Sequence, residues 1–481
     1  MKNRIKQYLL AASMCVGLTA CSDFFEPIPG VQFGLDETFA SKQRTEEYLN
    51  NVYSYVREVT DAIHPNTYGG IFTEASLDGA NRWNKTYAEW TNGSFNSASA
   101  QASEYFSKYY QAIAKASTFI QNVDKCTEAA ASTRGKWKSE ARALRAYYYF
   151  ELLRLYGPIP LIGEDPIPLD ASLEELIKER NSVDECVNFI ATELQSAIDS
   201  GDLLQRAGKA NLGRMDVATC MALKAKLYLY WASPLFNGNT DQASVKNKDG
   251  KQLFPQTEDN SKWTQARDTY ERFMTFATGQ GYKLTEVYTN GKLDPYASCR
   301  AAGEFFTTTW EAVDELIFVK LRDLYDYTYW VCPKFTDFQD TDVTGGGGYY
   351  TTQETVDLFF TKDGLTIEED PGYDKFEGIP SANNFTSGRY YDPNNPSRLY
   401  FDADKSKVLK QWKDREPRFY VNITYSGSIW LNEGKYNEEM RTDFTNGANG
   451  TCGKSKASGD CPDSGYLIRR GAKASNNNGS K

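Results

Sequence analysis

The chain has 481 residues and a formal net charge of −10, with 54 lysines and arginines against 64 aspartates and glutamates. This acidic balance argues against nucleic-acid binding, because such a surface must be basic to displace counterions from phosphate. The single histidine excludes metal motifs that need two histidines. Aromatic residues are abundant, at 14% of the chain, so a folded core is expected rather than a disordered acidic chain.

The N-terminal region has the pattern of an export signal. Three basic residues precede an apolar stretch over residues 8–20, which is shorter than the roughly 20 residues that a membrane-spanning helix needs. The sequence Leu18-Thr19-Ala20-Cys21 is typical of the site where a bacterial lipoprotein is cleaved and acylated. We therefore expect a signal peptide over 1–20, a palmitate-bearing lipid on Cys21 and an extended tether over 21–35. The alternative is an ordinary cleavage site followed by an accidental cysteine.

The cysteine pattern shows no metal-like spacing. Cys186 and Cys220 lie within apolar helical patterns, where a thiol behaves as a small hydrophobe. Cys452 and Cys461 bracket a short loop rich in glycine, lysine and serine, in a protein expected to be exported to a compartment that permits disulfides. These two cysteines are therefore a candidate disulfide.

Helical periodicity is the main secondary-structure signal. Apolar residues recur at steps of three and four over residues 103–122 and again over residues 135–156. Gly157-Pro158 ends the second of these predicted helices. In the second helix Leu144 and Tyr148 belong to the apolar stripe, expected to face the helix at 103–122, and Arg145 lies off it. Ser182 and Glu185 form a capping box at the start of the third helix. The predicted helices span residues 38–62, 103–122, 135–156, 183–199, 214–232 and 261–278.

Four of these helices form two similar hairpins. Ala143-Leu144-Arg145-Ala146 in one hairpin recurs as Ala222-Leu223-Lys224-Ala225 in the next. Small alanines at this spacing allow close helix approach, as in tetratricopeptide hairpins, whose units stack neighbour on neighbour. The predicted fold is mostly α, an α-solenoid of tetratricopeptide-like hairpins with long inserted loops, forming a single domain over 36–481.

Two long segments between the helices are rich in aromatic residues, at 62–100 and 285–350. Loops of this length in a folded chain are usually functional or disordered, and their aromatic content argues against disorder. Rings beside amide and guanidinium groups suit a sugar ligand, although each ring could also pack internally. The run Gly345–Gly348 lacks the lysine of a phosphate loop and is read as a flexible turn. The candidate ligand-binding residues are Asn81, Arg82, Trp83, Asn84, Trp90, Tyr327, Tyr329 and Trp330.

Several segments together resemble the SusD/RagB family of outer-membrane nutrient-binding lipoproteins. The most specific is Glu140–Ile162, which is similar to the family's signature helix and the turn that follows it. The resemblance extends over essentially the whole mature chain. It is carried also by Cys21-Ser-Asp-Phe-Phe, Arg180-Asn-Ser-Val183, Gly213-Arg214, the helix 218–232, residues 352–359 and Asp363-Gly364.

The resemblance implies a ligand surface built from inserted loops on helical hairpins. Members of the family bind glycans, or peptides in some lineages, and cover a SusC-like TonB-dependent transporter in the outer membrane. It therefore implies a lipid-anchored, surface-facing binding protein rather than an enzyme, with no cofactor and no catalytic residue. Family members continue past a segment like Ser464–Arg470 into further helices, whereas here a polar tail follows. We accordingly expect the closing helices to be missing.

Two other functions stay open on the sequence alone. Peptide capture by the same fold is compatible with the acidic charge. A secreted glycoside hydrolase would need two carboxylates about 5–9.5 Å apart, and acidic residues such as Asp78, Glu89 and Asp326 are candidates that no motif marks as a pair. Asp337–Asp342 could supply oxygen ligands to calcium, but the spacing of an EF-hand is absent, so no metal site is assigned.

Overall fold

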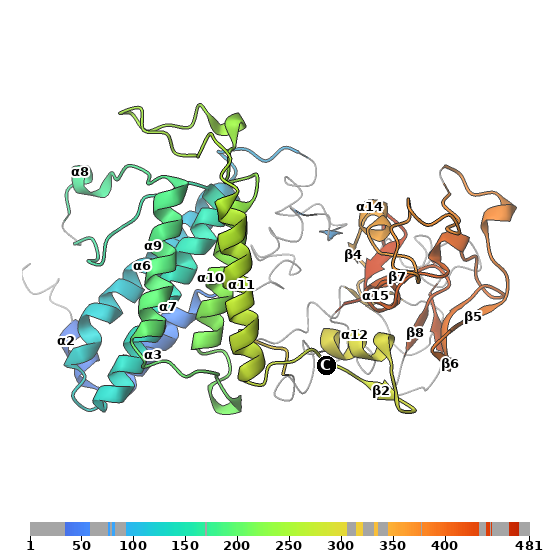
Figure 1. Cartoon of the computed structure of the whole chain (residues 1–481), viewed down its shortest axis with the longest axis horizontal. Helices are drawn as coiled ribbons and strands as arrows, with labels where there is room; N and C mark the ends of the chain where they lie inside the picture. Colours follow the sequence, from blue (N-terminus) through green and yellow to red (C-terminus); the bar gives the residue numbers. More distant parts are fainter. Residues whose placement is uncertain are drawn as a thin grey trace, which may run out of the picture.

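The computed structural model describes residues 34–57, 76, 79–81, 93–168, 171–304, 314–320, 331–334, 345–376, 378–431, 439–442, 444 and 461–470. These residues form two lobes, one at each side of Figure 1. The helical lobe holds the elements from α2 (Leu35–Ala40) to α11 (Ser261–Gly279). The mixed lobe holds β1 (Ala80–Asn81) together with the elements from β2 (Tyr288–Thr289) to β10 (Tyr466–Ile468). The described chain is mostly helical, as the periodicity predicts.

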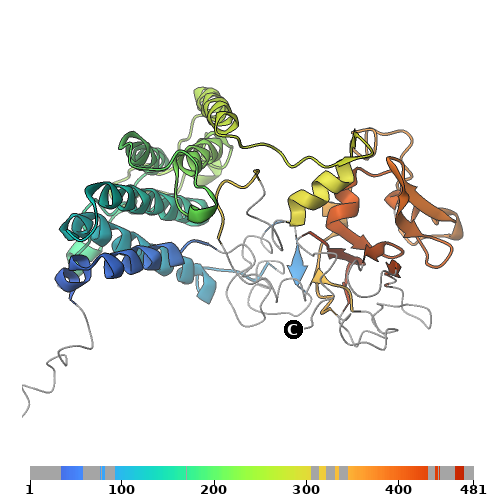
Figure 2. The same cartoon turned by 90° about the horizontal axis from the view of Figure 1, so that it is seen from below.

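The helical lobe is a stack of hairpins in which each long helix lies beside the next (Figure 2). α6 packs on α7 and α9 on α10, while α7 also packs on α9 and α10 on α11. The hairpin solenoid is thereby confirmed. The helices are α2 (Leu35–Ala40), α3 (Lys42–Ser54), α6 (Ala100–Asn122), α7 (Ala131–Tyr156), α8 (Leu173–Leu176), α9 (Val183–Asp199), α10 (Val217–Ala232) and α11 (Ser261–Gly279), with single turns η2 (Val123–Lys125), η3 (Lys209–Asn211) and η4 (Thr240–Gln242).

Local capping explains several helix ends. The predicted capping box at Ser182 and Glu185 is confirmed at the start of α9, and Gly157 ends α7 with a φ of 67°. α10 begins at Val217 rather than at residue 214, because the Asp216 carboxylate accepts the Thr219 amide proton and caps the helix there. The helix expected over 38–62 is divided at Ser41, whose backbone is extended.

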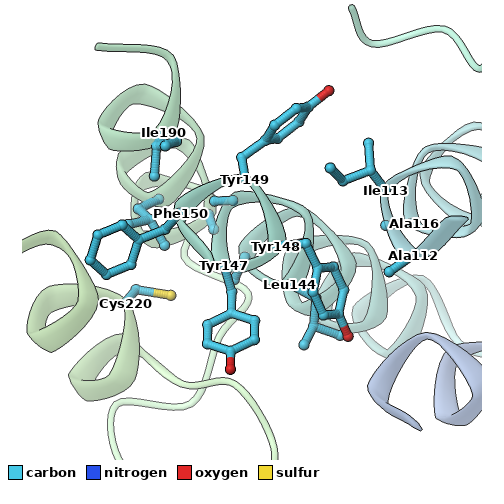
Figure 3. Close-up of a cluster of buried hydrophobic side chains, with 14 of the residues drawn as sticks. Ala112, Ile113, Ala116, Leu144, Tyr147, Tyr148, Tyr149, Phe150, Ile190 and Cys220 are labelled. Atoms are coloured by element: carbon cyan, nitrogen blue, oxygen red, sulfur yellow. The ribbon is translucent and has the colours of Figure 1, made fainter. Parts of the chain in front are cut away.

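α7 lies at the centre of the helical lobe and is covered on several sides (Figure 3). The predicted contact with α6 is confirmed: Leu144 and Tyr148 are fully buried and turned toward Ala112 and Ala116 of that helix. Phe150 lies on another side of α7, toward α9 and α10. A helix covered in this way must be apolar over most of its circumference.

Charged side chains of α7 are also buried, each with a partner. The Arg145 guanidinium, with 0% exposure, donates to the Glu193 carboxylate of α9 and to the Ser117 hydroxyl of α6. Glu140 accepts from the Tyr53 hydroxyl at 2.9 Å and pairs with Arg214 at 3.0 Å. Burying such groups is tolerable only when they are paired. Their position off the apolar stripe therefore does not place them in solvent.

The mixed lobe contains a four-stranded antiparallel sheet assembled from distant parts of the chain. The strand order is β1 (Ala80–Asn81), β4 (Tyr349–Tyr350), β10 (Tyr466–Ile468) and β7 (Ile423–Tyr425). Three hairpins accompany it: β2 (Tyr288–Thr289) with β3 (Lys292–Leu293), β5 (Arg389–Asp392) with β6 (Asn395–Asp402), and β8 (Ile429–Leu431) with β9 (Glu439–Arg441). Its helices are α12 (Pro295–Glu304), α14 (Gln353–Asp357), α15 (Pro417–Asn422), η7 (Ala382–Asn384) and η8 (Lys410–Trp412).

The mixed lobe has a core of its own, made mainly of stacked aromatic rings. The rings of Tyr400 and Tyr420 are nearly parallel, with centroids 3.9 Å apart. Arg415 is buried beside them and donates to the carbonyl oxygens of Val356 and Phe359, which fixes the end of α14. The abundant aromatic residues therefore serve in part to build this core. Within the described chain, no helix has both the length and the apolar character needed to cross a membrane.

Candidate functional site

The structure places one of the eight predicted ligand residues, Asn81, which forms part of strand β1. The other seven, Arg82, Trp83, Asn84, Trp90, Tyr327, Tyr329 and Trp330, lie outside the described residues. The same holds for Cys21 and Cys452, so the lipid anchor and the disulfide stay predictions, while Cys461 is buried.

The flank of the first cluster is held in the sheet of the mixed lobe. Ala80 lies opposite Tyr350 and Asn81 opposite Tyr349 in the antiparallel β1–β4 pair. β4 is in turn bonded to β10, with Leu467 opposite Tyr350. The first cluster therefore starts, at Asn81, on an edge strand fixed to β4.

The flank of the second cluster is held at nearly the same place. Val331 and Cys332, which follow Trp330 directly, are both buried. The amide of Gly345 donates to the carbonyl oxygen of Pro333 at 3.1 Å, and the amide of Gly347 donates to that of Cys332 at 3.0 Å. Residues 345–350 therefore bind both flanks, Asn81 through β4 and Val331–Pro333 through the glycine run. We call residues 331–333 and 345–350 the joint anchor.

The glycine run is a packed part of this joint anchor, so its interpretation as a flexible turn is wrong. All four residues from Gly345 to Gly348 are buried. A Cβ atom built on Gly345 would lie 2.2 Å from the carbonyl oxygen of Cys332 and 2.5 Å from its Cβ. Only glycine allows two backbone segments to approach so closely. A run of glycines directly before Tyr349-Tyr350 was the sequence signal for this close approach.

The opposite flank of each cluster lies on the helical lobe. After the first cluster the described chain resumes at Gly93 and enters α6. Before the second cluster, residues 314–320 cross the helical lobe: Asp314 pairs with Arg206 at 2.9 Å, and the Lys320 amine donates to the carbonyl oxygens of Ser54 and Val56. Both predicted clusters are thus segments with one described end on each lobe.

A charged group buried in α7 adjoins this crossing. The Glu151 carboxylate lies between Arg154, at 2.9 Å, and Arg57, at 3.6 Å. The Tyr147 hydroxyl accepts the Arg57 amide proton, and its ring meets that of Phe318 edge-on with centroids 6.2 Å apart. Burial raises the pKa of Tyr147, and the Glu151 charge raises it further. The tyrosine therefore stays neutral and acts as a hydrogen-bonding and packing residue.

The described residues hold no evident metal site, since none of them form a group of three or more His, Cys, Asp or Glu side chains able to hold a metal ion. The acidic segment 337–342 lies outside the described chain. So do the three carboxylates considered for a glycoside hydrolase, Asp78, Glu89 and Asp326. In the described residues, the joint anchor holds the flank of the first cluster close to the flank of the second. Such an arrangement suits binding between two loops.

Comparison with known proteins identifies the chain. A model described as "SusD family" matches residues 315–481, and a model described as "Starch-binding associating with outer membrane" matches residues 32–229. The two matches cover parts of both lobes. The chain belongs to the SusD/RagB family. A SusD-like protein of Bacteroides ovatus is 27% identical over 175 residues, which is 35% of this chain and 30% of that relative. The match thus spans less than a third of the relative's length.

Solved SusD-like structures share the fold over both lobes. The protein BT4246 has a TM-score of 0.72 at 23% identity, covering 90% of this chain and 72% of that one. A SusD-like protein of Bacteroides fragilis NCTC 9343 has a TM-score of 0.61 at 20% identity, covering 91% and 71%. A SusD-like carbohydrate-binding protein of the same strain has a TM-score of 0.59 at 16% identity, covering 91% and 69%. At these identities the likeness establishes the fold alone.

Proposed function

We propose that this SusD-like chain is a surface lipoprotein of the outer membrane that binds a glycan and delivers it to a TonB-dependent transporter, without catalysing a reaction. The joint anchor is the observation that carries the ligand-binding part. Its residues 345–350 bond to Asn81, at the start of one aromatic cluster, and to Cys332 and Pro333, just after the other. Support comes also from the family description and from the carbohydrate-binding relative of the same fold.

The chemistry of sugars explains why two such clusters should act together. A sugar presents a flat C–H face that stacks on an aromatic ring, while its hydroxyl groups need amide or guanidinium partners. Stacking on one ring contributes on the order of 1 kcal/mol beyond the buried area. Useful affinity therefore needs several rings, and Trp83 and Trp330 come from clusters whose flanks share the joint anchor.

The test is substitution of these two tryptophans. Trp83→Ala and Trp330→Ala should each weaken polysaccharide retention in native affinity gels at least tenfold, equivalent to about 1.4 kcal/mol. Circular dichroism and the melting temperature should stay near those of the wild type. Trp263→Ala is the matched control, because Trp263 is 42% exposed on α11 of the helical lobe. Early unfolding of both variants, with normal binding by the folded fraction, would show that the two rings pack internally.

The anchoring and delivery steps have separate tests. Cys21→Ala should abolish palmitate labelling and membrane fractionation, and continued labelling would contradict the lipid site. Delivery predicts co-purification with a large outer-membrane β-barrel in mild detergent. Recovery of the lipoprotein alone, from native membranes in which the barrel is expressed, would count against the pairing.

A further inference from the structure

The helical lobe contains a groove that is separate from the joint anchor and from the segments it holds. It lies between α9, α10 and α11, which run side by side in Figure 1, and has a volume of about 730 Å³. This volume falls within the usual range of roughly 300–1,000 Å³ for ligand sites. The floor is formed by Met221, Lys224 and Tyr228, which recur on one face of α10.

The wall from α11 is polar along its whole length. Its lining residues recur at helical spacing, so they share one face of α11, while Phe273 and Ala277 of the same helix are buried in the lobe. Hydroxyl and amide groups predominate on this face. The α11 residues lining the groove are Ser261, Thr264, Gln265, Asp268, Thr269 and Arg272.

Two cationic side chains, Lys224 and Arg272, line the groove. Lys224 is half-buried on α10, and its amine donates to the Gln195 side-chain oxygen at 2.7 Å. The amide nitrogen of Gln195 is held in turn by Asp199 at 2.7 Å. Burial lowers the pKa of Lys224; the Asp199 charge opposes this shift and the Arg272 charge adds to it. Among the described residues, neither Lys224 nor Arg272 forms a salt bridge.

The carboxylate that lines the groove, Asp268, is paired with a neighbouring arginine. Asp268 accepts from Arg267 at 2.7 Å, and Arg267 itself is not a lining residue. The groove therefore presents Lys224 and Arg272 to its interior without a carboxylate paired to either. Half-burying an amine costs desolvation energy, which an anionic ligand would offset by pairing with it.

We infer that the α9–α10–α11 groove binds an acidic oligosaccharide, with a sugar carboxylate between Lys224 and Arg272. The guanidinium suits a carboxylate because it can donate two parallel hydrogen bonds. The hydroxyl and amide groups of α11 suit sugar hydroxyls. This site is distinct from the one held by the joint anchor, and the inference stands without the proposed function.

The experiment uses oligogalacturonate as the probe in isothermal titration of the full chain. Wild-type protein should bind it, and Lys224→Met and Arg272→Gln should each weaken binding at least tenfold. Raising the salt concentration should also weaken binding, because these charges are partly exposed to solvent. Lys226→Met is the matched control, since Lys226 lies on α10 but outside the groove lining. This variant should bind oligogalacturonate as tightly as the wild type does.

Three further arms separate the alternatives. A neutral galactose oligomer of equal length should not share the dependence on Lys224, and an oligoglutamate peptide should bind more weakly than oligogalacturonate. Trp83→Ala should leave oligogalacturonate binding unchanged. The inference is overturned if oligogalacturonate fails to bind, if its affinity is equal in all lysine and arginine variants, or if oligoglutamate binds as tightly. Loss of oligogalacturonate binding in Trp83→Ala alone would move the ligand to the loop site, and would leave the proposed function standing.

Discussion

In the helical lobe each long helix contacts the helices that precede and follow it in the sequence, whereas in the mixed lobe one small sheet joins strands from four distant parts of the chain. The neighbouring helices α6 and α7 are separated by a single 3-10 turn. The paired strands β1 and β4, in contrast, lie at residues 80–81 and 349–350. Local contacts leave a periodic pattern in the sequence, and distant pairings do not.

The two lobes also bury their polar groups differently. In the helical lobe, buried charges on α7 pair with charges on neighbouring helices, as Arg145 does with Glu193. In the mixed lobe Arg398 is paired in the same way with Asp294 and Asp392, but Arg415 donates instead to backbone carbonyl oxygens at the end of α14. Short strands and helices leave more backbone groups without regular partners, so side chains must satisfy them.

The largest effect is expected from removing the central cation of the helical lobe. Arg145→Met would leave the Glu193 carboxylate buried, with Arg142 as a distant partner at 3.9 Å. Removal of one member of a buried pair typically costs about 3–5 kcal/mol. Urea unfolding followed by far-ultraviolet circular dichroism measures the loss. Arg142→Met is the control and should cost under about 1 kcal/mol, because its side chain is partly exposed; equal losses would contradict the central role of Arg145.

A smaller effect is expected from a cavity in the same lobe. Leu144→Ala removes a fully buried side chain from the contact between α7 and α6, and a change of this kind costs about 3 kcal/mol. The melting temperature should fall by several degrees. Leu173→Ala, at a position on α8 that is 74% exposed, is the matched control and should change it little. An unchanged melting temperature in Leu144→Ala would mean that this face is not core.

The mixed lobe should respond to acid through Asp294. The hydrogen bond from Arg398 lowers the pKa of Asp294 to about 2. A carboxyl group whose pKa is lower in the folded state stabilises the fold fully above its unfolded pKa of about 3.9, and that stabilisation is lost as the pH falls toward 2. The contribution is about 2 kcal/mol. Tryptophan fluorescence during urea unfolding, followed from pH 5 to pH 2, should show this loss in the wild type and a flatter profile in Asp294→Asn.

A matched carboxylate in the helical lobe sharpens this comparison. The Lys251 amine lowers the pKa of Glu185 to about 2 as well, but both side chains are substantially exposed. Water screens such a pair, so Glu185→Gln should cost under about 1 kcal/mol at neutral pH. Equal costs for the Asp294 and Glu185 variants would show that burial does not distinguish the two sites.

An effect on binding rather than on stability is expected at the joint anchor, and it rests on the proposed function. Gly345→Ala places a methyl group against the Cys332 carbonyl oxygen, so residues 331–333 must move away from residues 345–350. We expect glycan retention to fall at least tenfold, which corresponds to about 1.4 kcal/mol, while the helical signal is kept. Gly303→Ala in α12 is the control, because a Cβ atom there meets nothing within 4 Å. Normal retention by Gly345→Ala would show that the joint anchor does not position the ligand loops.

The sequence by itself determined the helical hairpins and some of their ends. The periodicity located α6, α7, α9, α10 and α11, and the Ser182–Glu185 box and Gly157 located helix ends. These signals act between residues a few positions apart, so they can be read without knowing the rest of the fold. The family resemblance, whose most specific segment includes α7, was confirmed by the two family models.

Tertiary structure alone decided the burial of Arg145, the pairing of Asn81 with Tyr349 and the role of the glycine run. Arg145 is buried because α6 and α9 cover α7 from two sides, which a single apolar stripe does not reveal. Gly345 and Cys332 meet because folding brings two irregular segments together, and no periodic pattern records such a contact. Contacts between distant segments depend on where each segment is carried by the whole fold, whereas helix periodicity and caps depend only on near neighbours.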